Sequence, residues 1–151
     1  MKTLIRFLKR YWIIFTALII SFLMFYPALG SFFTHDDFYF LKISEASSFK
    51  EFAGFFNPVK DDQNIGVYRP LPLRVYYFLG TSVFNLNPLG LRAVSFITFF
   101  LDILLVGYLA KLLTKNNKIS SLSIFLYAVS VTHFGQIYYV GAFQELLITL
   151  L

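Results

Sequence analysis

The sequence predicts an all-α membrane protein with about four transmembrane helices and a long extracytoplasmic first loop containing short amphipathic helices. Of its 151 residues, 58% are hydrophobic and 14% are charged, whereas a soluble domain carries roughly a quarter charged residues. Aromatic residues make up 21% of the chain, and such rings suit lipid-facing helix surfaces and the headgroup boundary. There is no cysteine, which excludes disulfides and Cys-based metal sites.

The first predicted span covers residues 11–34 and follows a basic cytoplasmic flank, residues 1–10. This run carries no charge and exceeds the about 20 apolar residues that cross a bilayer core. Ala28, Leu29 and Gly30 offer the small-residue pattern of a signal-peptidase site, so a cleavable signal is the alternative. The apolar stretch is longer than the usual signal core of about 7 to 15 residues, which favours an uncleaved helix.

Residues 35–88 are predicted to form a non-spanning loop with interfacial helices. Acids and bases alternate there, and residues that break helices recur at Pro58, Gly66, Pro70, Pro72 and Pro88. Ser48 and Glu51 stand at capping-box spacing, which indicates a short helix. Residues 73–84 form a second helical piece that could lie in the plane of the membrane interface.

Three further apolar segments follow the loop. Residues 89–114 are interrupted by Asp102, and residues 119–134 are rich in serine, which is typical of helices that pack closely in lipid. Residues 142–151 begin a fourth span without a stop signal. We therefore expect the chain to be the N-terminal piece of a longer protein.

The distribution of charge predicts the orientation. The N-terminal flank and the segment 111–118 hold seven Lys/Arg and no acid, whereas residues 36–92 hold six of each. The positive-inside rule places the N-terminus in the cytoplasm and the long loop outside, as expected of a multi-pass protein of the plasma membrane. The net charge of +5 is thus a topology signal, and no nucleic-acid partner is predicted.

Two features of the loop could carry chemistry. His35, Asp36 and Asp37 follow the first span, and two adjacent, partly desolvated carboxylates call for a cation, a metal or a proton nearby. They could act as a general base or as metal ligands, or they could simply end a helix in water. Arg69, after Tyr68 and before a proline, is biased to an extended conformation. Its planar guanidinium suits phosphate or carboxylate, and snorkelling to headgroups is the alternative.

The predicted topology brings later residues to the same side. If the third span runs outward, His133 and Gln136 reach its outer end and Glu145 starts the fourth span there; the alternative is a wet loop with interfacial tyrosines. Asp102 lies in the middle of a span, where an ionisable group usually faces the protein interior. A structural partnership with a polar group or an Arg of another helix is the favoured interpretation, and a functional role stays open.

The order of these features resembles the N-terminal part of the C-type (GT-C) polytopic membrane glycosyltransferases, relatives of the protein O-mannosyltransferases and of bacterial polyprenyl-phosphate-sugar transferases. The resemblance lies in Asp36-Asp37 outside the first helix, in Tyr68-Arg69-Pro70-Leu71 and in Glu145-Leu146-Leu147 at the fourth helix. The sequence departs where many relatives carry a His in the second span, because Asp102 lies near that place.

The resemblance implies inverting transfer of a sugar from a polyprenyl-phosphate donor to an extracytoplasmic acceptor. Asp36 or Asp37 would be the general base, and the substrate or lipid phosphate would be bound by Arg69, Tyr68, His35, His133 and Glu145. Some relatives hold a divalent cation on the acid pair and others do not, so Mg or Mn on Asp36 and Asp37 stays an open alternative. The rival interpretations are a non-catalytic polytopic membrane protein and an ion- or proton-coupled transporter subunit that uses Asp102.

Overall fold

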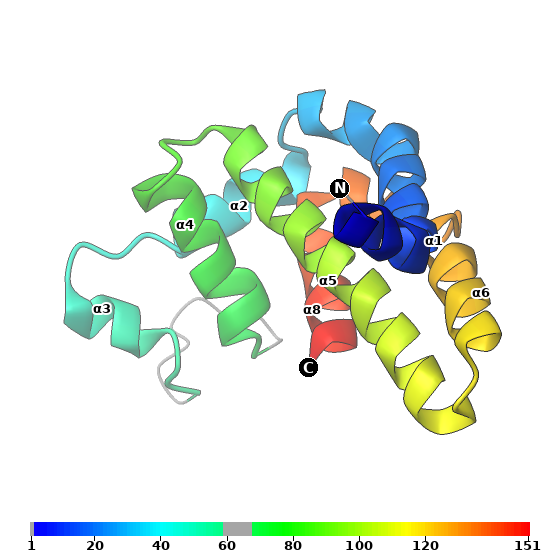
Figure 1. Ribbon diagram of the computed structural model, residues 1–151. Coiled ribbons are helices and arrows are strands. Elements are labelled where there is room, and N and C mark those ends of the chain that lie inside the picture. The colour runs from blue at the N-terminus through cyan, green and yellow to red at the C-terminus, as the bar shows by residue number, and fades with distance from the viewer. Residues whose placement is uncertain (1, 59–67) are drawn as a thin grey trace.

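The structure is a computed structural model that describes residues 2–58 and 68–151. Within this part the chain is all helical, with 78% of residues in helices and no strand, which confirms the all-α part of the predicted fold class. The elements are α1 (Lys2–Phe25), η1 (Tyr26–Gly30), α2 (His35–Ile43), α3 (Phe49–Gly54), η2 (Pro70–Val75), α4 (Tyr76–Ser82), α5 (Pro88–Thr114), α6 (Asn117–Ala128), α7 (His133–Tyr138), η3 (Val140–Ala142) and α8 (Phe143–Leu150) (Figure 1).

Among the described residues, two helical segments are long and apolar enough to cross a membrane. They are Trp12–Gly30, of 19 residues, and Pro88–Thr114, of 27 residues, and each has a mean hydropathy of 2.1. At 1.5 Å per residue, α5 is about 40 Å long, which exceeds the bilayer core. Length and composition therefore indicate contact with a lipid bilayer, and the four-span arrangement remains a prediction.

The third predicted span, residues 119–134, is divided between two helices. α6 ends at Ala128 and α7 begins at His133. In the break, Ser130 Oγ lies 2.8 Å from Thr132 Oγ1 and accepts a long bond from the Thr132 N–H. Hydroxyl side chains that bond locally compete with helical hydrogen bonds, and the flanking valines are poor helix formers. With 12 residues, α6 is about 18 Å long, shorter than a bilayer core.

α5 is the central helix of the fold, and α6 runs back along it from a tight turn. Lys115, with φ of 51°, ends α5 in the left-handed conformation, and the Asn116 side chain accepts from the Lys118 N–H at 2.9 Å to cap α6. Further along, Ser120 Oγ donates to the Gly107 carbonyl at 2.7 Å. A Cβ at position 107 would lie 2.3 Å from Ile124, so the two helices meet through a residue without a side chain.

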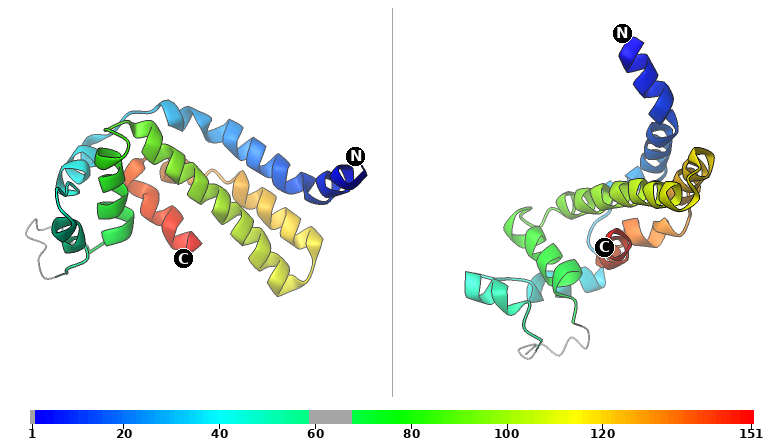
Figure 2. Two further views of the ribbon diagram at one scale, coloured as in Figure 1. Left: turned by 60° about the vertical axis from the view of Figure 1, so that its left-hand side comes forward. Right: turned by 60° about the horizontal axis from the view of Figure 1, so that its bottom comes forward.

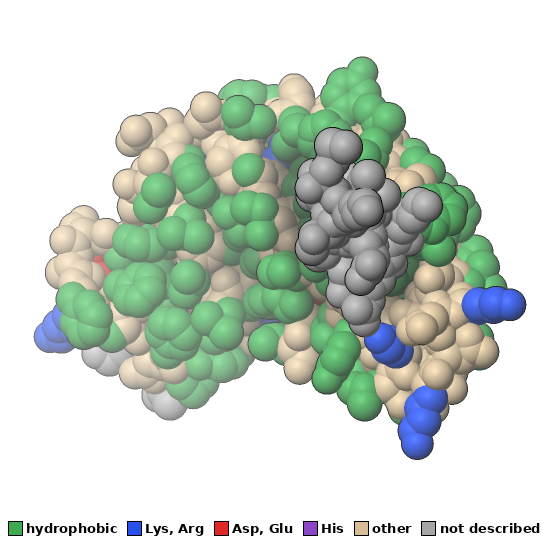
Figure 3. All heavy atoms as spheres, in the orientation of Figure 1, with side chains coloured by type: hydrophobic (Ala, Val, Ile, Leu, Met, Phe, Trp, Pro, Cys, Tyr) green, Lys and Arg blue, Asp and Glu red, His purple; other side chains and the backbone are tan. Residues whose placement is uncertain are grey.

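The molecule has two distinct ends (Figure 2). The N-terminal part of α1 and the α5–α6 turn lie at one end, and α2, α3 and α4 lie at the other. We call these the hairpin end and the loop end. Lys and Arg side chains gather at the hairpin end, while apolar side chains cover much of the visible face (Figure 3). Exposed apolar residues follow α1, α5 and α6, including Ile19, Leu23, Ile97, Leu101, Leu122 and Leu126.

The α4–α5 corner fixes the loop end against the central helix. Asn85 and Leu86 both have positive φ, at 49° and 61°, and the Leu86 N–H donates to the Gly80 carbonyl at 2.8 Å. The predicted helical piece 73–84 corresponds to η2 and α4. Tyr76 and Tyr77 of α4 are buried in the protein instead of lying at the lipid interface.

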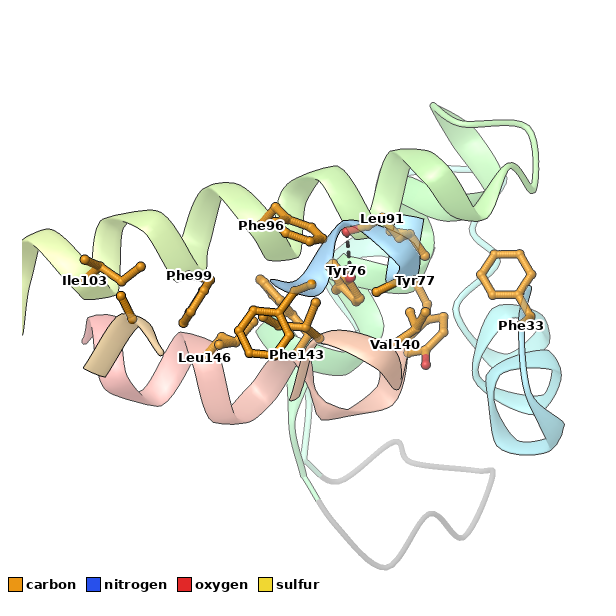
Figure 4. Close-up of a cluster of buried hydrophobic side chains, with 14 of the residues drawn as sticks. Phe33, Tyr76, Tyr77, Leu91, Phe96, Phe99, Ile103, Val140, Phe143 and Leu146 are labelled. Atoms are coloured by element: carbon orange, nitrogen blue, oxygen red, sulfur yellow. Dashed lines mark hydrogen bonds between the residues drawn. The ribbon is translucent and has the colours of Figure 1, made fainter. Parts of the chain in front are cut away.

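The hydrophobic core lies where α4, α5 and α8 meet (Figure 4). The Tyr76 ring stacks on Phe143 with centroids 3.9 Å apart. Its hydroxyl donates to the Leu91 carbonyl at 2.8 Å and lies 2.7 Å from Ser95 Oγ. Tyr76 therefore links three helices with both its ring and its polar end.

Candidate functional site

Asp36 and Asp37 have opposite surroundings although they are neighbours in the sequence. Both lie in the first turn of α2, after the N-cap residue Thr34. Asp36 is exposed, whereas Asp37 is completely buried. Consecutive residues of a helix point in different directions, so the predicted acid pair is divided between the surface and the interior.

Asp37 is held by three hydrogen bonds. It accepts from the Thr34 N–H at 2.8 Å, from the Thr34 hydroxyl at 3.0 Å and from the Tyr77 hydroxyl. Burial, and then the hydrogen bond to Asp37, raises the pKa of Tyr77. The phenol thus stays protonated and remains a donor at neutral pH. This carboxylate is a capping and anchoring group, with its oxygens already engaged.

Asp36 meets the segment that leads into α8. The Tyr139 hydroxyl donates to Asp36 Oδ2 at 3.3 Å. Burial, followed by the carboxylates of Asp36 and Asp37, raises the pKa of Tyr139 to about 12. Tyr139 is therefore an O–H donor at neutral pH, and the exposed carboxylate of Asp36 keeps one oxygen for another partner.

Arg69 reaches the other end of the same segment. It is exposed, and its guanidinium donates to the side-chain oxygen of Gln144 in the first turn of α8. Its φ of −140° and ψ of 71° lie outside the helical region, as the following proline predicts. Tyr139 and Gln144 flank η3, so one six-residue segment, 139–144, contacts both Asp36 and Arg69.

Three other predicted site residues have different positions. The exposed Tyr68 donates its hydroxyl to the Phe56 carbonyl at 2.8 Å and so ties the start of η2 to the end of α3. Glu145 is exposed beside Gln144, where a carboxylate suits a helix N-terminus. His35 is the first residue of α2, and its side chain lies outside the described part.

His133 has its ring nitrogens engaged in the interior. The residue is buried, with Nδ1 2.7 Å from Gln136 Oε1 and Nε2 2.8 Å from the Tyr127 carbonyl oxygen. The ring also packs against Phe99 and Tyr127, with centroids 4.8 and 4.5 Å away. These contacts describe a satisfied packing residue, and the substrate-binding role of His133 stays a prediction.

Among the side chains that the structure describes, which do not include that of His35, the acid pair has no third metal ligand. No group of three or more His, Asp or Glu side chains there could hold a metal ion. Asp61 and Asp62, the other acids of the loop, lie outside the described residues. Segment 139–144 therefore contacts an exposed acid through the Tyr139 phenol and an exposed guanidinium through Gln144, and these groups are suited to proton transfer and anion binding.

Sequence reasoning missed the residue with the most polar contacts, Arg92. It lies in the second turn of α5 and is only 1% exposed. Its guanidinium donates to four backbone carbonyls, those of Ser31, Phe32, Ile137 and Tyr138, at 3.0 to 3.2 Å. In the sequence, Arg92 lies roughly 15 Å along a helix from Asp102 and is a poor direct partner for it. A charge inside an apolar helical run was the available signal, because such residues face the protein and find partners there.

Asp102 is the second buried charge of α5, and its surroundings differ. It is fully buried, and neither carboxylate oxygen has a hydrogen-bond partner among the described residues. The predicted partner, a polar group or an Arg of another helix, is therefore not found in this part of the chain. Comparison with protein-family models, with characterised proteins and with solved structures found no match to the chain.

Proposed function

We propose that this chain carries the acid and phosphate-binding elements of a membrane glycosyltransferase that takes its sugar from a polyprenyl-phosphate donor. One observation carries the proposal: segment 139–144 contacts both Asp36, through Tyr139, and Arg69, through Gln144. An exposed carboxylate and an exposed guanidinium thus form hydrogen bonds to side chains of the same segment. A lipid-linked donor needs a general base for its acceptor and a cation for its leaving phosphate.

Asp36 is the general base in this proposal, since Asp37 is already engaged by Thr34 and Tyr77. The acceptor hydroxyl attacks the anomeric carbon from the side opposite the phosphate and gives its proton to Asp36. The carbon–oxygen bond to phosphate breaks, and the electron pair leaves with the lipid phosphate. The product is a glycoside of inverted configuration. Tyr139 donates to one oxygen of Asp36 and orients the other.

Arg69 binds the departing phosphate. A guanidinium has five N–H donors in a planar fork, and Gln144 accepts from Nη1. This contact orients the group and leaves further donors for phosphate oxygens, which Arg recognises in pairs.

The distribution of charge along the molecule supports an extracytoplasmic location of this chemistry. The hairpin end carries Lys111, Lys115 and Lys118, and the loop end carries Asp36 and Arg69. If α1 and α5 cross the bilayer, the positive-inside rule places the hairpin end in the cytoplasm. Asp36 and Arg69 then lie at the outer surface, where flipped lipid-linked sugars are available.

The test is transfer from a panel of radiolabelled polyprenyl-phosphate hexoses and pentoses by membranes that contain the chain. Asp36→Asn should lower the transfer rate about 10²- to 10⁴-fold, the usual contribution of a general base. Glu45→Gln is the matched control, because Glu45 is an exposed acid just after α2. Full activity of Asp36→Asn, at equal membrane level, would contradict the assignment.

A second candidate function, proton- or ion-coupled transport, has one observation in its favour. Asp102 is buried in a candidate span without a hydrogen-bond partner in the described part of the chain, and such residues can mark ion pathways. Uptake into proteoliposomes that Asp102→Asn abolishes and Asp36→Asn leaves unchanged would support transport. The reverse pattern, with sugar transfer lost only in Asp36→Asn, would support the transferase.

A further inference from the structure

Arg92 joins two segments that are far apart in the sequence. Nε donates to the Ser31 carbonyl and Nη2 to the Phe32 carbonyl, both at 3.0 Å. Nη1 donates to the carbonyls of Ile137 and Tyr138, at 3.2 and 3.0 Å. One side chain of α5 therefore holds the chain after η1 against the end of α7.

The segment after η1 is also held from its other side. Asp37 accepts from the backbone and hydroxyl of Thr34, and Tyr77 of α4 donates to the same carboxylate. The four residues 31–34 are thus fixed at one end by Arg92 and at the other by Asp37. They lead directly into α2 and Asp36.

The segment at the end of α7 leads directly to the other half of the contact. Ile137 and Tyr138 immediately precede Tyr139, whose hydroxyl donates to Asp36. Arg92 therefore acts on the two backbones that carry Asp36 and Tyr139, although none of its own hydrogen bonds is to either side chain.

The carbonyl groups that Arg92 contacts explain why position 92 of α5 is occupied by an arginine. Ser31 and Phe32 lie outside regular helix, and Ile137 and Tyr138 are the last residues of a short one. Such carbonyls lack helical partners, and unpaired backbone groups are costly when buried. A guanidinium can serve several of them in a fixed planar geometry, which an ammonium group does not provide.

We infer that Arg92 is a positioning residue that sets the separation of Asp36 and Tyr139 by holding residues 31–34 against residues 137–139. The inference depends on the proposed function only for the role of Asp36 as the general base. The positioning itself is a property of the fold. It can be measured without any assay of sugar transfer, so the two proposals can fail separately.

The test is a distance measurement by pulsed electron paramagnetic resonance on the full chain in nanodiscs. The absence of native cysteine allows Lys42→Cys on α2 and Val131→Cys just before α7 to carry the only two spin labels. Both positions are exposed. Arg92→Lys, which keeps the charge and loses the fork, should broaden or shift the distance distribution. Lys118→Arg exchanges the same two side-chain types at an exposed position beside the distant α5–α6 turn, and it should leave the distribution unchanged.

Two results would overturn the inference. A distribution in Arg92→Lys that coincides with the parental one would show that the guanidinium does not set the separation. Loss of helix content in far-ultraviolet circular dichroism would show that Arg92 supports the whole fold instead of one contact. A changed distance at unchanged helix content is the result that the inference requires.

Discussion

The loop end and the hairpin end of this chain are stabilised in different ways. At the loop end, buried polar groups from distant parts of the sequence bond to one another: Arg92 to four carbonyls, Tyr77 to Asp37, and Tyr76 to Leu91 and Ser95. At the hairpin end, two regular helices meet through Gly107, with a single serine hydroxyl bonding across the contact.

The difference follows from the regularity of the backbone. Long helices satisfy their own N–H and C=O groups, so α5 and α6 need only close packing between small residues. The loop end consists of short helices and connecting segments, whose unpaired backbone groups require side-chain partners. Irregular backbone is also what allows residues such as Asp36 and Tyr139 to be brought together, so the polar contacts and the candidate site occur at the same end.

The largest expected effect is at Asp37. Asp37→Ala would leave Tyr77 and the Thr34 N–H without their acceptor, and we expect a loss of about 3 kcal/mol in the free energy of unfolding. Asp36→Ala, at the exposed neighbour, should cost less than about 0.5 kcal/mol. Denaturant titration in mixed micelles measures both. Equal losses would remove the distinction between the anchoring and the exposed acid.

At the hairpin end, the free energy of unfolding should depend on the size of the side chains between the helices more than on their polarity. A methyl group at position 107 would lie 2.3 Å from an Ile124 side-chain carbon, so Gly107→Ala should separate the helices and cost about 2 kcal/mol. The control is Gly54→Ala, where a Cβ meets no atom within 4 Å. The same unfolding titration compares the two variants. A neutral Gly107→Ala would mean that close packing does not hold the hairpin.

Asp102, in the middle of α5, follows neither pattern, since it is a buried acid without a hydrogen-bond partner in the described residues. Replacing it with an apolar residue of similar size removes the cost of desolvating a carboxyl group. Asp102→Leu should therefore raise the free energy of unfolding by about 1 kcal/mol. A decrease in thermal stability would instead indicate a polar partner that the described residues do not include.

The smallest effect concerns pH. The pKa of Tyr139 is raised by burial from 10.0 in the unfolded chain to about 12 in the folded one, so the stabilisation is complete below pH 10 and is lost as pH rises to about 12. Tyr76 and Tyr77 also have raised pKa values and contribute in the same direction. Tyr139→Phe should therefore reduce, without abolishing, the fall in melting temperature above pH 10. An unchanged slope would contradict the described environment of Tyr139.

Hydrophobic patterning predicted the elements that depend on local sequence. The long apolar run gave α5 within one residue of its N-terminal end, and the Ser48 to Glu51 spacing gave the start of α3, where Ser48 accepts from the Glu51 N–H at 3.3 Å. The predicted topology brought His133, Gln136 and Glu145 to the same side of the membrane as Asp36 and Arg69, and this shared side stays a prediction; segment 139–144 contacts both Asp36 and Arg69. The catalytic roles of these residues stay predictions.

Contacts that depend on direction could not be read from the sequence. The sequence shows two adjacent acids, and only the start of α2 at His35 decides that Asp37 faces inward and Asp36 outward. Likewise, the four carbonyls that Arg92 contacts belong to backbone that has no residue-type signature. The break of residues 119–134 depends on hydroxyl bonds between Ser130 and Thr132 that compete closely with helix formation.

The corner between α4 and α5 makes the loop end intolerant of changes in chain length. Leu86 is exposed and takes a left-handed conformation, which is strained for a residue with a branched side chain. The neighbouring glycines are packed tightly, because a Cβ at Gly90 would lie 2.2 Å from the Phe84 ring and one at Gly80 would lie 2.9 Å from Leu91. An inserted residue here would rotate α4 about its axis and turn the Tyr77 hydroxyl away from Asp37, so natural length variation is expected elsewhere in the loop.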